Sequence, residues 1–389
     1  MIYLHEPFTK SEEKKNLTKC LDVNQISSIG LFIKKFEDKI SAYTSSKYAI
    51  ACSSGTAALH IALKVLGVNE DCEVIVPTIT FIATANAVKY NQADLIFMDN
   101  DDYFNIDEKK TIEFLNQNTF QKKGFCINKK SGKKIQAIII THMYGNAAEF
   151  ENLYKILKKK NIKIIEDSAE SFGTKYTYGL FKGKHTGSIG DIGCFSFNGN
   201  KIITTGNGGA IITNNKMYAN KFKYYINQSK ENEIEYIHND IGYNYRMTNL
   251  SSALGCAQID RINLILKKKK KIYKNYSESL KKNLFFKLSE VPHYGKNNHW
   301  LTICKIINSK QKKNIDKIKK IIEIFFYKGI ELRPVWKPCH LQKHYRKSQK
   351  YKITNATRLY YNSFCLPSGP GMTINSIKKI LRLLNKIKT

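Results

Sequence analysis

The chain has 389 residues, of which 42% are hydrophobic, so it is long enough for one large domain and a smaller second one. No apolar run approaches the ~20 residues of a membrane span, and the opening Met1–Leu4 passes at once into polar residues, unlike a secretory signal. The nine cysteines are an odd number without a Cys-x-x-Cys pair, which argues against a disulfide framework or a zinc site. We therefore expect a cytoplasmic protein without a metal centre.

The formal net charge of +32 raises the hypothesis of a nucleic-acid or anionic-membrane partner. The excess is mostly lysine, and it is spread along the whole chain. The densest run, Lys267–Lys271, follows Ile259, Ile262 and Leu266 at helical spacing, which predicts a solvated helix face. Because no zinc finger or RNA-binding aromatic motif accompanies the lysines, we expect neither a nucleic acid nor a membrane as partner.

Strand and helix patterns alternate between about residues 45 and 215, which predicts an α/β fold with a mainly parallel sheet. The expected strands are Ala49–Cys52, Glu73–Val76, Leu95–Met98, Ala137–Thr141, Lys163–Glu166, Cys194–Phe197 and Ala210–Thr213. Within this region Phe120–Lys134 carries two glycines among lysines and predicts a loop excursion.

The second part of the chain predicts a smaller α+β domain. A long helix is expected from about Leu250, followed by a strand near Trp300–Ile307. We therefore expect a large domain at 1–250 and a small one at 251–389, with residues 1–40 packing near the small domain.

The first candidate binding motif follows the apolar strand Tyr48–Cys52. The chain there enters a turn of small residues that contains Gly55 and Thr56, and then a helix with leucines at helical spacing. Unpaired N–H groups at a helix start point toward an anion, and the Thr56 hydroxyl adds a donor. The turn therefore predicts a phosphate site, although ordinary helix capping also accounts for it.

Two further candidates lie at strand ends. Phe81, at a strand-to-helix switch, could lie over a flat ligand ring, or it could be an ordinary core residue. Asp167 ends the strand that begins at Lys163, and ligands of open parallel sheets bind at the carboxyl ends of strands. A carboxylate there can pair with a protonated ring nitrogen, or it can simply cap the next helix.

Lys201 lies on a tight turn between two apolar strands, before a glycine-rich stretch. Burial there lowers the pKa of an ammonium and makes the neutral amine available as a nucleophile. That is what a lysine needs to form a Schiff base, although a lysine on a loop more often has no such role. A phosphate site, a carboxylate for a ring nitrogen and such a lysine together indicate a pyridoxal phosphate site.

Arginine is scarce, with six in the chain and none before Arg246. In a chain so rich in lysine, each arginine suggests a need for planar, bidentate binding. Arg333 begins a stretch, 333–344, that is expected to face the active site and also holds Trp336 and His340. A carboxylate or a diphosphate would suit both arginines, while a surface ion pair and a core tryptophan are the alternatives.

The segments SSGTAALHIAL, VPTITFIATANAV, EDSAESFG, GSIGDIGCFSFNGNKIITTGNGGAIIT and GYNYRMTNLSSALGCAQID occur in that order. With them, the chain from about His5 to about Pro367 resembles the DegT/DnrJ/EryC1/StrS family of pyridoxal phosphate-dependent sugar aminotransferases. The resemblance implies a fold-type I transferase that works as a homodimer with shared active sites.

The resemblance also implies roles around the cofactor ring. Lys201 matches the Schiff-base lysine, and Asp167 matches the partner of the pyridine nitrogen. Phe81 matches the residue that stacks on the ring. Glu170 departs from the family pattern, because many members carry Gln or His at this position, in contact with the cofactor's 3′-oxygen.

The phosphate of the cofactor is implied to lie among four matched positions. Gly55 and Thr56 match the phosphate loop, and Ser196 matches a phosphate-binding serine five residues before the lysine. Asn244 matches an asparagine that reaches the phosphate from the partner subunit.

A closer resemblance links the chain to the subgroup related to legionaminic acid biosynthesis, which aminates C4 of a nucleotide-linked 4-keto-6-deoxy-N-acetylhexosamine. The segments that carry it are His5–Phe8, Ile26–Gly30, Cys126–Lys129 and Arg333–Trp336. An apparent insertion at Lys175–Phe181 departs from the pattern. The residues expected to touch the substrate are His5, Arg246, Arg333, Trp336 and His340.

The function expected from the sequence is transamination of such a sugar with L-glutamate as amino donor, for a surface glycan or a nonulosonic acid. One family branch replaces the lysine with histidine and dehydrates its substrate, so Lys201 argues for transamination. The alternatives are a C3-aminotransferase acting on a 3-keto sugar nucleotide and a non-catalytic basic binding or regulatory protein on the same fold.

Overall fold

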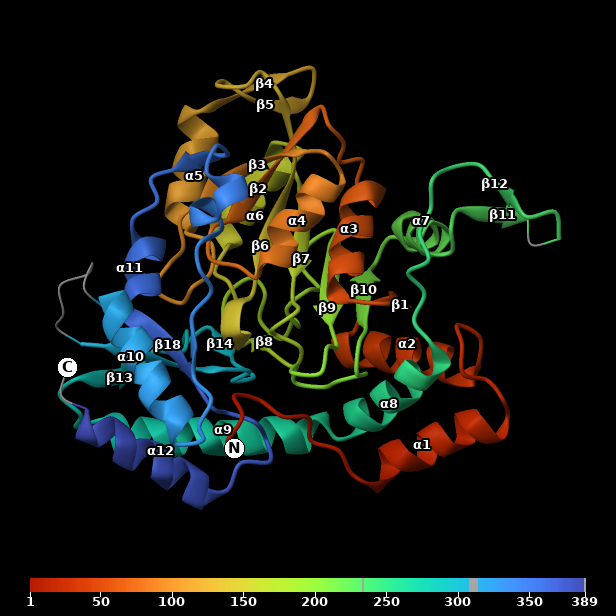
Figure 1. Cartoon of the computed structure of the whole chain (residues 1–389). Helices are drawn as coiled ribbons and strands as arrows, with labels where there is room; N and C mark the ends of the chain where they lie inside the picture. Colours follow the sequence, from red (N-terminus) through yellow and green to blue (C-terminus); the bar gives the residue numbers. More distant parts are fainter. Residues whose placement is uncertain (233, 308–313, 388–389) are drawn as a thin grey trace.

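The computed structural model describes residues 1–232, 234–307 and 314–387. Its central feature is a large sheet with a mainly parallel core (Figure 1). In spatial order, its main strands are β1 (Tyr48–Cys52), β10 (Gly209–Thr213), β9 (Ile192–Ser196), β7 (Lys163–Asp167), β6 (Lys134–Thr141), β2 (Cys72–Pro77), β3 (Asp94–Met98) and β17 (Gln349–Tyr351).

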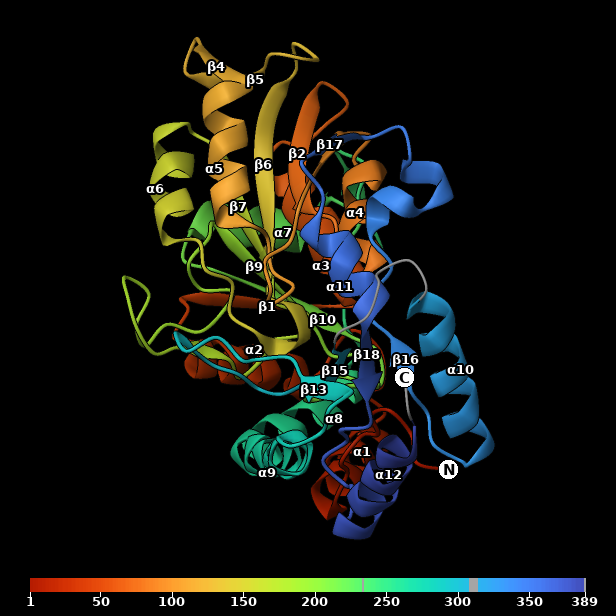
Figure 2. The ribbon, with the colours of Figure 1, turned by 90° about the vertical axis from the view of Figure 1, so that its left-hand side faces the viewer.

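Neighbouring strands from β9 to β17 run parallel, while β10 is antiparallel to both β1 and β9. Helices cover both faces of the sheet, which explains why its strands read as near-continuous apolar runs (Figure 2). One face packs against α3 (Gly55–Val65), α4 (Ile82–Tyr90) and α7 (Lys216–Ile226), and the other against α5 (Glu108–Gln117) and α6 (Glu151–Lys159). This architecture is that of a fold-type I transferase.

Most of the remaining elements lie below the large sheet in Figure 1. A small antiparallel sheet has the order β13 (Phe286–Leu288), β15 (Thr302–Ile306), β18 (Ser363–Leu366) and β16 (Arg333–Pro334). The helices of this part are α1 (Ser11–Asp22), α2 (Leu31–Thr44), α8 (Asn249–Asp260), α9 (Ile262–Leu280), α10 (Asn314–Tyr327), α11 (Asn355–Asn362) and α12 (Ile374–Lys386). Among the described helices, none is both long and apolar enough to cross a bilayer.

Two contacts cross the domain boundary that the sequence predicts near residue 250. Ile2 forms a parallel bridge with Ile330, and β17 adds to the large sheet beside β3. The first contact ties the N-terminal segment to the second half of the chain. The division into 1–250 and 251–389 stays a prediction.

The expectation of a loop at Phe120–Lys134 is wrong. The segment forms the hairpin β4 (Thr119–Lys122) and β5 (Phe125–Asn128), which pairs onto β6. The connecting residues Lys123 and Gly124 have φ of 49° and 78°. Two consecutive positive φ angles are what a tight type I′ hairpin turn requires, and the many lysines on the exposed faces concealed this pattern in the sequence.

The predicted lysine face of the long helix is also wrong in part, because Lys269 is buried. The helix ends at Asp260, and α9 then begins, with Ile265, Lys269, Ile272 and Tyr276 along its buried side. Lys269 therefore lies within the apolar stripe, where its ammonium donates to the backbone carbonyls of Trp300 and Ser368. Burial lowers the pKa of this lysine well below its ordinary value.

Two short strand pairs complete the fold. The apparent insertion begins with β8 (Lys175–Tyr176), which pairs with β14 (Gly295–Lys296). The strands β11 (Lys230–Asn232) and β12 (Ile237–His238) form an arm that projects away from the body of the molecule in Figure 1.

Candidate active site

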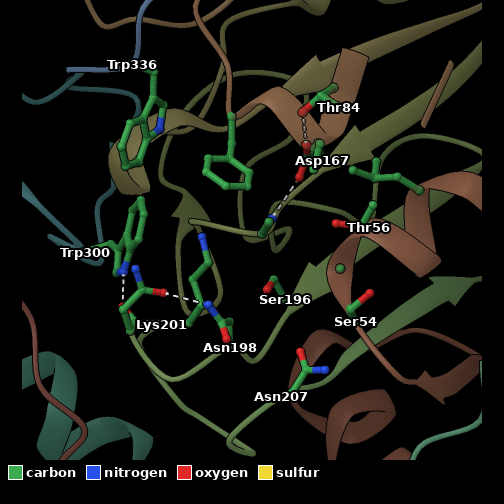
Figure 3. Close-up of a pocket in the computed structure, with 16 residues that line it drawn as sticks. Ser54, Thr56, Thr84, Asp167, Ser196, Asn198, Lys201, Asn207, Trp300 and Trp336 are labelled. Carbon is green, nitrogen blue, oxygen red and sulfur yellow. Dashed lines mark hydrogen bonds between the residues drawn. The ribbon is translucent and has the colours of Figure 1, made fainter. Parts of the chain in front are cut away.

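A pocket of about 240 Å³ opens at the carboxyl ends of β7 and β9, beside the start of α3 (Figure 3). The strand register explains this meeting point, because Cys52 of β1 lies opposite Gly209 of β10, which lies opposite Ser196 of β9. The turn after β1 is thereby brought against the end of β9. The sequence-predicted residues that line the pocket are Gly55, Thr56, Phe81, Asp167, Ser196, Lys201 and Trp336.

One wall of the pocket is the N-terminus of α3. The Ser54 hydroxyl caps this helix by accepting the N–H of Ala57 at 3.0 Å, and the two preceding residues of the first turn, Gly55 and Thr56, line the pocket. A Cβ on Gly55 would come within 2.7 Å of the Ser196 Cβ, so only glycine allows the helix start to lie this close to the serine. A helix N-terminus beside two hydroxyl groups, those of Thr56 and Ser196, suits a phosphate group.

Lys201 lies across the pocket, on the turn after β9. Its backbone N–H bonds the carbonyl of Asn198 at 3.0 Å, and its Nζ lies 3.9 Å from the centre of the Trp300 ring. The Trp300 indole N–H donates to the carbonyl of Asn200 at 2.6 Å, so the ring and the lysine turn are held together. Burial lowers the pKa of Lys201, and the carboxylates of Glu170 and Asp167 oppose that shift.

Asp167 ends β7 with its carboxylate at the pocket. Its Oδ2 accepts the Thr84 hydroxyl at 2.7 Å, and its Oδ1 accepts the N–H of Ala169 at 3.2 Å. Burial raises the pKa of Asp167, while these two hydrogen bonds and the charge of Lys201 act to lower it. The following residues form turns rather than a helix, so the carboxylate does not cap a helix as the alternative interpretation expected.

Phe81 and Trp336 form an aromatic wall. Phe81 is 52% exposed and meets the Trp336 ring edge-on, with the ring centres 5.7 Å apart. Trp336 lies near Trp300 on the side of the pocket opposite Ser54 and Thr56 (Figure 3). Glu170 does not line the pocket itself, and it contacts the wall by accepting the Trp336 indole N–H at 3.0 Å.

Besides Glu170, five predicted residues do not line the pocket of this chain. Arg333 is exposed and pairs with Glu331, while Arg246 donates to the side chain of Asn227 and the carbonyl of Ser28. His340 is buried, with its Nδ1 2.7 Å from the Thr78 hydroxyl oxygen, and burial lowers its pKa to about 4.

The other two are His5 and Asn244. Among the described residues, neither ring nitrogen of His5 has a hydrogen-bond partner; burial, then Lys269 and Lys201, lower the pKa of this histidine. Asn244 is exposed and bridges Asn227 at the base of the arm.

Sequence reasoning missed nine residues that line the pocket: Ser54, Leu59, Ala83, Thr84, Ala169, Asn198, Asn200, Asn207 and Trp300. Trp300 had a usable signal, because the chain contains only two tryptophans and both lie at this site. The asparagines had none, since asparagine is common throughout this chain.

The fold and the pocket define the chain as a fold-type I, pyridoxal phosphate-dependent transferase. It belongs to the DegT/DnrJ/EryC1/StrS aminotransferase family, whose profile matches residues 7–385. The family consists of sugar aminotransferases, which confirms the predicted family, enzyme class and cofactor.

Relatives cover nearly the whole chain. A GDP-perosamine synthase of Escherichia coli O157:H7 is 35% identical over 386 residues, covering 99% of this chain and 98% of the relative. A UDP-4-amino-4,6-dideoxy-N-acetyl-beta-L-altrosamine transaminase of Campylobacter jejuni is 29% identical over 397 residues, covering 100% and 98%. Among solved structures, Helicobacter pylori PseC, an aminotransferase of pseudoaminic acid biosynthesis, has a TM-score of 0.86 at 25% identity and covers 98% of each chain. The predicted legionaminic acid subgroup stays a prediction.

Proposed function

We propose that the enzyme transfers the amino group of L-glutamate to C4 of a nucleotide-linked 4-keto-6-deoxy-(N-acetyl)hexosamine. The observation that carries this proposal is a pocket in which Lys201 lies across from a helix N-terminus suited to an anion, with a buried carboxylate in the same lining, in a chain 35% identical to a GDP-perosamine synthase. That relative and the altrosamine transaminase both make 4-amino sugars, which supports C4 over the alternative C3. The family of enzymes argues against the non-catalytic alternative.

The residues of the pocket fit pyridoxal phosphate. Thr56, Ser196 and the α3 N-terminus would hold its phosphate, since Gly55 leaves the cradle open. Phe81 would cover the ring, and Asp167 would hold a proton on the ring nitrogen. When bound, the cofactor supplies an electron sink for the carbanion at the reacting carbon.

Lys201 would move the proton in this reaction. Its Nζ takes the proton from the reacting carbon as a base and returns one as an acid, which requires an amine with a pKa below that of an ordinary lysine. Burial of Lys201 lowers its pKa in that direction. Trp300 and the aromatic wall exclude water from the same side of the pocket.

The substrate is tested with a panel of nucleotide sugars. We expect the purified enzyme to aminate a 4-keto-6-deoxy sugar linked to UDP or GDP with glutamate as donor, and the product to carry the amino group at C4 by NMR. Amination of 3-keto sugars alone would replace the proposal with the C3 alternative. Amination with another amino donor, and none with glutamate, would overturn the choice of donor.

We also propose that the working unit is a homodimer in which Asn244 reaches the cofactor phosphate of the partner subunit. Asn244 is exposed and lies outside the pocket of its own chain, at the base of the projecting arm. Asn244→Ala should weaken cofactor retention by about tenfold, because a hydrogen bond to a charged group is lost. The measurement is the dissociation constant of pyridoxal phosphate from absorbance titration.

The matched control is Asn385→Ala, at an exposed position on α12. It should retain the cofactor as the unchanged enzyme does. A monomer by analytical ultracentrifugation that binds the cofactor tightly and turns over normally would contradict the shared site. The predicted cytoplasmic location stays part of this proposal.

A further inference from the structure

Three residues from distant segments form a closed ring of hydrogen bonds behind the aromatic wall. The Glu170 carboxylate accepts the backbone N–H of Tyr144 at 2.8 Å through Oε2. Its other oxygen, Oε1, accepts the indole N–H of Trp336 at 3.0 Å. The backbone N–H of Trp336 donates to the Tyr144 hydroxyl at 3.0 Å, which closes the ring. Both carboxylate oxygens are therefore bound to protein donors.

The backbone at Tyr144 is shaped for this arrangement. Tyr144 is 1% exposed and lies in the short turn η1 (Met143–Gly145) with a φ of 54°. A bulky residue with positive φ is uncommon, and such positions persist where the surrounding structure requires them. Here the conformation directs the N–H of Tyr144 to Glu170 while its hydroxyl meets the backbone of Trp336.

The ring fixes Trp336 at two points, its backbone N–H and its indole N–H, so the side chain has little freedom to leave the pocket wall. Trp336 in turn packs against Phe81. The charges of Glu170 and Lys201 also act on each other. The buried Glu170 carboxylate thus binds Trp336 of the wall directly, and its charge acts on Lys201.

We propose that Glu170 is a positioning residue of this site, which holds Trp336 in the pocket wall directly through Oε1 and by way of Tyr144 through Oε2, and which presents a negative charge to Lys201. The proposal rests on the proposed function only in treating this pocket as the reaction site.

The charge has a definite sign of effect. An anion near Lys201 stabilises the ammonium form, so Glu170 raises the pKa of the lysine against the effect of burial. The other titratable groups that interact with this pair are Asp167 beside the pocket, and His5, Tyr144 and Cys365 from other segments. Burial raises the pKa of Glu170, and Lys201 together with the two N–H donors lowers it.

The test uses the full chain after removal of the cofactor, so that its outcome does not depend on which sugar is the substrate. Competitive labelling with acetic anhydride across pH, followed by peptide mass mapping, gives the midpoint of Lys201 reactivity. In Glu170→Gln this midpoint should fall by about one pH unit or more, because the opposing carboxylate charge is lost. The control Glu113→Gln removes a half-buried carboxylate of α5 that pairs with Lys352, and it should leave the midpoint unchanged.

Tryptophan fluorescence reads the wall directly, because Trp300 and Trp336 are the only tryptophans in the chain. Glutamine offers one acceptor oxygen for two N–H donors, so Glu170→Gln should increase acrylamide quenching by about fivefold. Tyr144→Phe, which removes the hydroxyl that accepts the Trp336 N–H, should increase quenching as well. It should leave the labelling midpoint of Lys201 in place, because the carboxylate charge remains.

These two variants separate the parts of the proposal. An unchanged labelling midpoint in Glu170→Gln would overturn the charge effect on Lys201. Unchanged quenching in both Glu170→Gln and Tyr144→Phe would overturn the holding of Trp336. If Glu170→Gln does not fold by circular dichroism, Tyr144→Phe decides the holding of the wall. Glu170→Asp, which keeps the charge on a shorter side chain, then decides the charge effect: its labelling midpoint should stay within the range of the unchanged chain, and a fall would overturn it.

Discussion

Lys201→Ala should abolish transamination while leaving the fold intact. The lysine is the only cation that lines the pocket described above, and its Nζ lies against the Trp300 ring. General acid–base catalysis typically contributes 10²–10⁴-fold, so we expect turnover to fall by at least about 10³-fold, or about 4 kcal/mol in the activation free energy. Single-turnover kinetics with glutamate measure the loss, and circular dichroism checks the fold.

Borohydride reduction of the loaded enzyme should place a pyridoxyl group on Lys201 in peptide mass mapping. Two other lysines make this a demanding test, because burial lowers the pKa of Lys269 as well and that of Lys305 to about 8. A lowered pKa alone therefore does not single out Lys201, whereas its position in the pocket does. A label on Lys269 or Lys305, or normal turnover by Lys201→Ala, would end the assignment.

Most of the large sheet could be predicted from the sequence because its strands are covered on both faces. A strand buried on both sides reads as an apolar run such as Ala137–Thr141, and the small-residue turn before α3 marks where a helix begins. The hairpin at Thr119–Asn128 could not be read in the same way, since most of its residues are exposed and they form no apolar run of the kind that marks a buried strand. The burial of Lys269 could not be predicted from the sequence, because the neighbouring lysines are chemically identical to it but lie on other sides of the helix.

The residues of the site fall into two groups: those that a local sequence pattern predicts, and those whose contacts come from distant segments. Gly55 and Asp167 could be predicted from local patterns, because Gly55 lies in a turn before a helix and Asp167 lies at the end of a strand. The contacts of Trp300 and Tyr144 depend on segments 100 and 192 residues away in the chain, which no local pattern encodes. The polar partners of His340 and Arg333 follow from such contacts too, so their predicted roles toward the substrate stay predictions.

Asp167→Asn should impair chemistry far more than folding. The carboxylate is buried at the end of β7. Hydrogen bonds from the Thr84 hydroxyl and the Ala169 N–H lower its pKa most, and the charge of Lys201 lowers it next. Such a carboxylate can hold a proton on the ring nitrogen of the cofactor, and asparagine cannot. One unit of pKa is about 1.4 kcal/mol, so a fall of two to three units in the basicity of that nitrogen would slow the reaction by about 10²- to 10³-fold.

Folding should change little in the same variant. Asparagine keeps one oxygen that can accept the Thr84 hydroxyl or the Ala169 N–H, and it removes the cost of burying a charge, so the free energy of unfolding should change by about 1 kcal/mol or less. Urea denaturation measures this change, and Asp260→Asn, at an exposed carboxylate paired with Lys39, is the matched control for both readouts. If Asp167→Asn binds the cofactor and keeps near-full turnover, the carboxylate serves only the turn at Ala169. A role at the ring nitrogen requires a large loss of turnover with an unchanged denaturation midpoint. If the carboxylate were merely structural, its replacement would lower turnover and the denaturation midpoint together.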